Sequence, residues 1–195
     1  MTSPTPAYRI FATRAAWRVW LAKNHDKAAS IWLAHYKKGV GKRSVSYGEA
    51  VEEALCFGWI DGLTKGIDAE KFAQRYSPRK PGSVWSVSNI ARVERLIAER
   101  RMTPAGMAHV ELAKLNGEWD AALAREDVDT VPADLERALR RRGLWADYSA
   151  WAPSHKKQYL YWLSSAKRPE TRQKRLEAIV EAAFSMAAAK NKRGE

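Results

Sequence analysis

The stretch from residue 46 to residue 78 constrains the fold most strongly, because it marks the start and the end of one helix and leads directly into strands. Ser46 and Glu49 have the spacing of a capping box, in which each side chain bonds to the backbone amide of the other residue. This spacing predicts a helix that begins at Tyr47. Gly58 is well placed to end the helix, since glycine adopts the left-handed conformation at the least cost.

Two strand patterns follow this helix. Residues 59–65 form a short strand-like run, and residues 72–76 alternate with a period of two, which places Gln74 on one face and Arg75 on the other. A third strand pattern, rich in aromatic residues, occupies residues 31–36. Together the three runs predict a small antiparallel sheet, and such a sheet needs helices to cover its apolar face.

Helical patterns account for most of the remaining chain. We expect the helices at residues 14–24, 47–57 and 87–100 to cover the sheet, with Ile90, Val93 and Ile97 facing inward from the last of them. Five more helices are expected, at residues 104–117, 133–142, 144–151, 154–167 and 169–189. The predicted fold class is α+β, mostly helical, with about three antiparallel strands and a helical C-terminal part.

The periodicity fades between residues 118 and 130, where acidic residues gather. We therefore place a domain boundary in this segment. The prediction is an α+β domain over residues 9–117, and a basic helical region over residues 131–190 that either packs on the first domain or forms a small subdomain. The length of 195 residues is sufficient to bury a real core.

Polar and aromatic side chains gather just after the capped helix. The candidate ligand-binding residues are Trp59, Asp61, Gln74, Arg75, Arg79 and Trp85. If these side chains converge on one opening, the arginines can grip a carboxylate or phosphate and the tryptophans can stack on a planar or cationic ligand. Alternatively, the aspartate serves an Asx turn, the arginines are solvated or salt-bridged, and the tryptophans are core residues. Cys56 suits a buried structural role, because a helix C-terminus disfavours a thiolate.

Three motifs carry a resemblance to a known family. They are residues 53–62, 74–79 and 83–86, followed by residues 92–97. These motifs resemble those of the YdeI/OmpD-associated family, also called bacteriocin-protection proteins, and the likeness runs from about residue 11 to residue 188. The resemblance implies a compact bacterial protein linked to resistance against antimicrobial peptides or envelope stress, with no agreed catalytic reaction. Val87 and Leu63 depart from the family pattern, which usually has a lysine and a polar residue there, so charge contacts at both positions are in question.

The net charge of +12 is concentrated in the C-terminal third of the chain, where residues 137–193 contain 14 Lys and Arg against four acids. Such a surface attracts nucleic acid, acidic proteins or anionic lipid, or only keeps a protein soluble. Trp145, Tyr148 and Trp151 are interleaved with these charges, as in surfaces that grip phosphates and stack bases. The alternative is a solvated helical face whose aromatic residues point inward. The candidate nucleic-acid residues are Arg140, Arg141, Arg142, Lys156, Lys157, Arg172, Lys174 and Arg175.

Several classes of function lack support in the sequence. The four histidines are scattered and there is a single cysteine, so we expect neither a metal nor another cofactor. No apolar run is long enough to span a membrane, and the lone cysteine agrees with a reducing cytoplasm.

Three functional hypotheses follow. The favoured one is a non-enzymatic binding protein, whose partner is an anionic small molecule, a peptide or a protein. The second is a nucleic-acid-associated protein that uses the basic C-terminal helices. The third is a small enzyme that acts on an anionic substrate, with Asp61 as acid or base.

Overall fold

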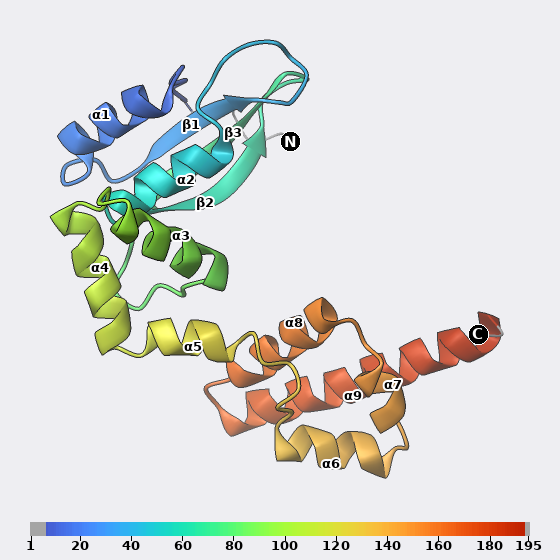
Figure 1. The fold of residues 1–195 in the computed structure, drawn as a ribbon. Coiled ribbons are helices and arrows are strands. Elements are labelled where there is room, and N and C mark those ends of the chain that lie inside the picture. The colour runs from blue at the N-terminus through green and yellow to red at the C-terminus, as the bar shows by residue number, and fades with distance from the viewer. Residues whose placement is uncertain (1–6, 194–195) are drawn as a thin grey trace. The chain divides into compact units, whose positions relative to one another are not determined.

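The computed structural model describes the backbone of residues 7–193 and the side chains of residues 7–190. The chain divides into two compact units, Met1–Ala122 and Leu123–Glu195, called unit 1 and unit 2 below. Figure 1 shows a sheet with helices in unit 1 and helices alone in unit 2. This confirms the predicted α+β class and the helical C-terminal part.

The elements follow the predicted order closely. Unit 1 contains α1 (Arg14–Asn24), β1 (Ile31–Tyr36), α2 (Tyr47–Cys56), β2 (Trp59–Gly66), β3 (Lys71–Pro78), α3 (Val87–Ala98) and α4 (Pro104–Leu115), and α5 (Glu118–Ala124) crosses into unit 2. Unit 2 contains α6 (Ala133–Arg141), α7 (Trp145–Ser149), α8 (Pro153–Ser164) and α9 (Pro169–Arg193).

The predicted capping box is present at the start of α2. The Ser46 hydroxyl accepts from the Glu49 amide at 3.3 Å, and the Glu49 carboxylate accepts from the Ser46 amide at 3.0 Å. After the helix, Gly58 has a φ of 74°, the left-handed conformation expected of it. The chain can therefore turn at once into β2, which begins at the next residue.

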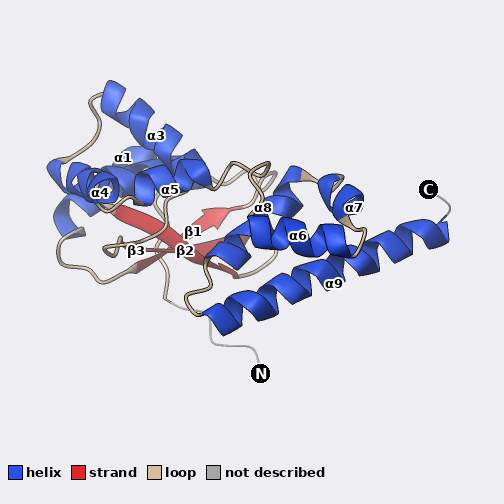
Figure 2. Ribbon diagram, turned by 90° about the horizontal axis from the view of Figure 1, so that it is seen from below, coloured by secondary structure: helices blue, strands red, loops and turns tan. Residues whose placement is uncertain are grey.

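The sheet is antiparallel, with the strand order β1-β3-β2. Figure 2 shows its strands in red beside the helices of unit 1. Because strand side chains alternate, Ile31, Leu33 and Tyr76 share one face. This face packs against the helices: the Trp17 ring of α1 lies 5.6 Å from that of Tyr76, and the Trp17 Nε1 donates to the Ala50 carbonyl oxygen of α2 at 3.1 Å. Helices α1 and α2 therefore cover one face of the sheet.

Two expectations about unit 1 are wrong in detail. Ile97 is 38 % exposed, whereas Leu96 is fully buried, because the inward face of α3 follows the spacing of Ile90, Val93 and Leu96. The segment after α4 is also more ordered than its weak periodicity predicts. It forms α5, which buries Trp119 in the core of unit 1.

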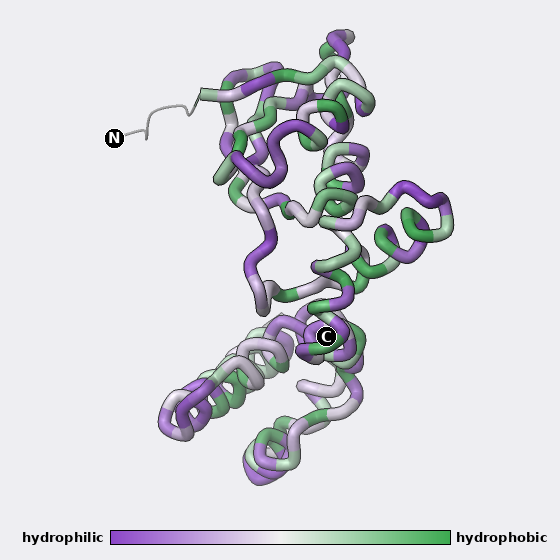
Figure 3. Tube along the Cα trace, turned by 90° about the vertical axis from the view of Figure 1, so that its left-hand side faces the viewer, coloured by the Kyte–Doolittle hydropathy of each residue, from purple (hydrophilic) through white to green (hydrophobic). Residues whose placement is uncertain are grey.

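Unit 2 has a hydrophobic core of its own. Leu135 and Leu139 of α6 pack with Leu163 of α8 and Ile179 of α9, and all four side chains are fully buried. Figure 3 shows hydrophobic and hydrophilic positions alternating along these helices, as amphipathic helices require.

His35 on β1 predicts a pH dependence for the stability of unit 1. Its side chain is 2 % exposed, its Nδ1 donates to the Val45 carbonyl oxygen at 2.8 Å, and its Nε2 is buried without a partner among the described residues. Burial lowers the pKa of His35, although the bond to Val45 opposes this effect. Because the unfolded histidine takes up a proton near pH 6.5 and the folded one does not, stability is fully present above that pH and falls as the pH drops below it.

Urea unfolding at pH 7.5, 6.5 and 5.5, followed by tryptophan fluorescence, tests this expectation. His35→Gln should lose less stability between pH 7.5 and pH 5.5 than the wild type. His109, whose pKa is also lowered by burial, should account for part of the dependence that remains. His155→Gln in unit 2 serves as the matched control, and an unchanged pH dependence in His35→Gln would contradict the assignment.

Candidate functional site

Trp59 and Gln74 belong to the packed interior of unit 1. Trp59 at the start of β2 is 1 % exposed, and its Nε1 donates to the His25 carbonyl oxygen at 2.9 Å. Gln74 in β3 is 3 % exposed, donates to the Gly62 carbonyl oxygen at 2.8 Å and accepts from the Thr64 hydroxyl. Both side chains use their polar atoms inside the protein and serve the structure.

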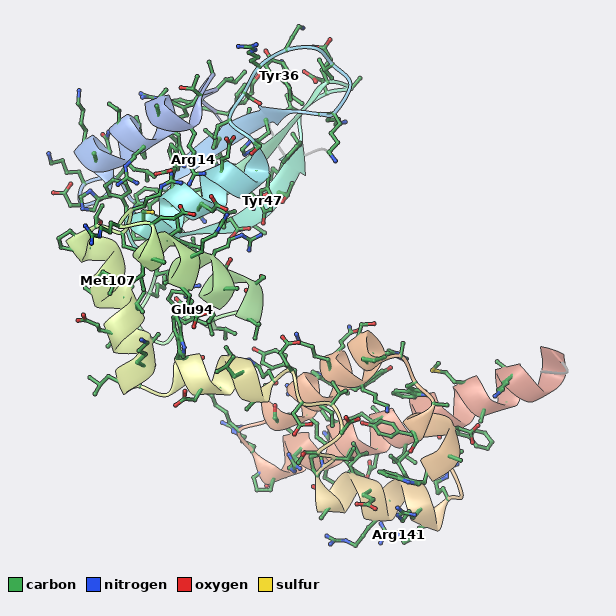
Figure 4. The ribbon with its side chains drawn as sticks, viewed as in Figure 1. Arg14, Tyr36, Tyr47, Glu94, Met107 and Arg141 are labelled. Carbon is green, nitrogen blue, oxygen red and sulfur yellow. The ribbon has the colours of Figure 1, made fainter. Side chains whose placement is uncertain are left out.

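Asp61 and Arg75 lie on opposite faces of the sheet. Asp61 is opposite Tyr76, and its Oδ2 accepts from the hydroxyl of Tyr47, labelled in Figure 4, at 2.7 Å. Burial and this bond raise the pKa of Tyr47 to about 12. Arg75 pairs with Trp32 and is exposed on the other face. The expected convergence of Asp61 and Arg75 is therefore not found, because strand alternation separates them.

Arg79 and Trp85, in contrast, are brought together. The Cζ atom of Arg79 lies 3.8 Å from the ring centroid of Trp85, and the two residues are 5 % and 4 % exposed. Within the described part of the chain, Arg79 makes no ion pair, and its Nε and Nη1 atoms have no hydrogen-bond partner. A buried guanidinium is normally paired with a carboxylate, so Arg79 stands out.

The electrostatics of Arg79 favour an added negative group. Burial lowers its pKa to about 10, and the charge of Asp61 offsets part of this effect. Arg79 is therefore still a cation at neutral pH. A desolvated cation without a partner is costly, and an acceptor at its free nitrogen atoms would reduce that cost.

A small cavity lies against Arg79. Its volume is about 10 Å³, which is close to the space that one water-sized group needs. Lys80 and Asn116 in its lining are exposed, so the cavity is reached from the surface. Ser83 and His109 also line it. Burial and the charge of Arg79 lower the pKa of His109, so this imidazole is neutral at pH 7 and adds no second cation.

Two close contacts of Gly58 hold residues of this cavity in place. The amide of Arg79 donates to the Gly58 carbonyl oxygen at 2.9 Å, which attaches the end of β3 to the end of α2. A Cβ atom on Gly58 would lie 2.4 Å from the His109 ring, so a larger residue there would displace this wall. Gly58 thus contacts both Arg79 and His109, and no room is left for a side chain at position 58.

The basic residues predicted to bind nucleic acid lie in unit 2, where many are occupied by internal contacts. Tyr148 and Trp151, the aromatic residues expected to stack on bases, are 1 % and 6 % exposed and belong to the core. Arg141, Lys156 and Lys174 are exposed or half-buried. The internal contacts are Arg140 with Glu136, Arg142 with Glu181, Lys157 with Glu126, Arg172 with Asp134, and Arg175 with the Trp162 carbonyl oxygen.

Other kinds of site find little support in the described part of the chain. Cys56 is buried, and its pKa is raised by burial and by the charge of Glu53, which fits the expected structural role. No cluster of three or more His, Cys, Asp or Glu among the described residues could hold a metal ion. None of the described helices is both long and apolar enough to cross a bilayer.

Comparison with known families divides the chain in a similar way. Residues 9–109, just over half of the chain, match the model described as Domain of unknown function (DUF8412). The chain belongs to the DUF8412 family. Residues 130–185 match a second model, described as Bacteriocin-protection, YdeI or OmpD-Associated, which confirms the resemblance over that part of the chain. No curated protein and no solved structure matches.

The DUF8412 match contains Arg79, Trp85 and His109, and it also contains the motifs between residues 53 and 97. Sequence reasoning included Arg79 and Trp85 among the candidates but missed His109. No local spacing connects His109 to Arg79, because α4 brings it to the cavity from a later part of the chain. Of the six candidates, the tertiary structure thus brings Arg79 and Trp85 together at one cavity, which His109 also lines.

Proposed function

We propose that this protein is a non-enzymatic binding protein that holds an anionic group of its ligand at Arg79. The observation that carries the proposal is a guanidinium that is 95 % buried, with two nitrogen atoms unpartnered beside a small cavity. A cavity of this size admits one oxygen of a carboxylate or phosphate, while the rest of the ligand stays outside.

The neighbours of Arg79 support an anion as the occupant. Trp85 stacks on one face of the guanidinium and supplies no negative charge, and Lys80 adds a second cation at the mouth. The likeness of residues 130–185 to bacteriocin-protection proteins adds the biological setting to the proposal, namely resistance to antimicrobial peptides or envelope stress.

The test compares the wild type with Arg79→Met. Thermal unfolding is measured in a low-salt buffer and during separate titrations with sodium phosphate, sodium acetate and sodium chloride. Phosphate or acetate should stabilise the wild type in a saturable way, by about 2.7 kcal/mol at one hundred times Kd. Arg79→Met should lack this response and should be at least as stable as the wild type in low salt, since it removes an unpaired buried charge.

Arg75→Met is the matched control, because it removes an exposed arginine of β3 that does not line the cavity. It should keep the response to anions. The same response in the wild type and in Arg79→Met would overturn the proposal. So would a large loss of stability of Arg79→Met in low salt, which would identify the stacking on Trp85 as purely structural.

A further inference from the structure

The sheet of unit 1 has a second face, opposite the one covered by α1 and α2. In register, Trp32 lies beside Arg75 and Tyr36 beside Lys71, so their side chains share this face. Lys65 also belongs to it, since its Nζ lies 5.7 Å from the Trp32 ring centroid. We call this surface the open sheet face and define it by Tyr8, Trp32, Tyr36, Lys65, Lys71 and Arg75.

The aromatic residues of the open sheet face are not core residues. Tyr8, Trp32 and Tyr36 are each half-buried, and none belongs to the hydrophobic core of unit 1. Tyr8 joins the surface because the backbone of Arg9 bonds to Trp32 and Ala34 at the free edge of β1. These three half-buried aromatic rings therefore do not contribute to the core of unit 1.

Basic side chains surround these rings. The Nζ atom of Lys65 lies 5.7 Å from the ring centroid of Trp32, and that of Lys71 lies 6.0 Å from the centroid of Tyr8. The Nζ atom of Lys42 lies 5.7 Å from the ring centroid of Tyr36. Lys71 and Lys42 also pair with Asp68 and Glu70, but Lys65 and Arg75 make no ion pair within the described residues. The loop that follows Tyr36, labelled in Figure 4, adds the exposed residues Lys37, Lys38 and Arg43.

We infer that the open sheet face binds single-stranded nucleic acid. Unpaired bases stack on aromatic side chains, while lysine and arginine contact the phosphates between them. Trp32 and Tyr36 are four residues apart on β1, about 13 Å along the strand, so they would stack on separate bases. Stacking of this kind needs bases that are not paired, which favours a single strand over a duplex.

Fluorescence anisotropy with a labelled 15-nucleotide oligo(U), using the full chain, tests this inference. Trp32→Leu should weaken binding roughly 5- to 150-fold, the loss expected for one stacked base. Lys65→Gln and Arg75→Gln should each lower the slope of log affinity against log salt by about 0.7. Near-ultraviolet circular dichroism shows whether each variant keeps the wild-type fold.

Two controls separate this surface from the other candidates. Arg79→Met should bind the oligonucleotide as the wild type does, so this test and the anion test can fail independently. Reversal of Arg140, Arg141 and Arg142 to Glu should change the affinity much less than Trp32→Leu. The opposite order would assign binding to unit 2 and overturn the inference.

Three further results would also overturn it. One is the absence of binding at low salt. Another is an affinity that Trp32→Leu leaves unchanged while the charge variants reduce it, which would show non-specific attraction alone. The third is equal competition by polyglutamate, which would identify the surface as a site for acidic proteins.

Discussion

Replacing Gly106 with alanine is expected to destabilise unit 1 by about 3 kcal/mol, the upper end of what overpacking usually costs. An ideal Cβ atom at this position would lie 2.2 Å from the Cys56 carbonyl oxygen and 2.8 Å from that of Leu55. Both are backbone atoms at the end of α2 and cannot rotate away. The substitution therefore has to push α4 away from α2.

That displacement would also break the bonds that attach α4 to α2. Thr103, the N-cap of α4, donates from its hydroxyl to the Cys56 carbonyl oxygen at 2.6 Å and from its amide to the same atom at 3.1 Å. These bonds satisfy a carbonyl that the end of α2 leaves free. Because His109 is on α4, the cavity beside Arg79 should be disturbed as well.

Gly48→Ala in α2 is the matched control. The same methyl group added there meets nothing within 4 Å, and Gly48 has no positive φ. Alanine should stabilise the helix by about 0.5–1 kcal/mol. Urea unfolding of both variants measures the difference, and a Gly106→Ala variant as stable as the wild type would contradict the close approach of the two helices.

The second large effect is expected for Glu53→Gln, which should cost about 3 kcal/mol. The Glu53 carboxylate is fully buried and accepts from Arg14, Arg18 and Arg101. Arg14, labelled in Figure 4, is the first residue of α1, and its Nε donates to Glu53 in α2. Although burial opposes it, the interaction with Glu53 raises the pKa of Arg14 and Arg18. Without the carboxylate, Arg18 would lose its ion pair, and Arg14 and Arg101 would keep only their pairs with Glu52 and Glu99.

Glu70→Gln provides the comparison for this experiment. Glu70 pairs with Lys42 at the surface, and both side chains are about half exposed, so its loss should change the free energy of unfolding much less. Guanidinium chloride screens ion pairs, and urea is therefore the denaturant to use. Equal effects of the two substitutions would show that the buried network contributes no more than a surface pair.

The candidate site was predictable only in part. Arg79 and Trp85 were identified because polar and aromatic residues gather after the capped helix, whereas Trp59 and Gln74 were identified for the same reason and use their polar atoms inside the protein. The residue types around a motif do not show which side chain has a polar atom without a hydrogen-bond partner in the folded protein. That depends on neighbours such as His109, which the chain brings from a distant helix.

The open sheet face was missed for a different reason. The alternation that was used to predict β3 already placed Arg75 opposite Gln74, and the aromatic run of β1 was recognised as a strand. What the sequence could not show was which face the helices cover, since both faces carry apolar residues. The basic C-terminal third drew attention instead, although many of its charges are paired internally.

The sequence by itself determined the local elements of this protein. The capping box at Ser46, the glycine at position 58 and the alternation of β3 are short-range signals, because caps, turns and strand faces depend on residues only a few positions apart. The tertiary structure alone decided which charges lack a partner and which aromatic rings stay outside the core. Burial and pairing depend on contacts between residues that are distant in the chain, and no local pattern encodes those contacts.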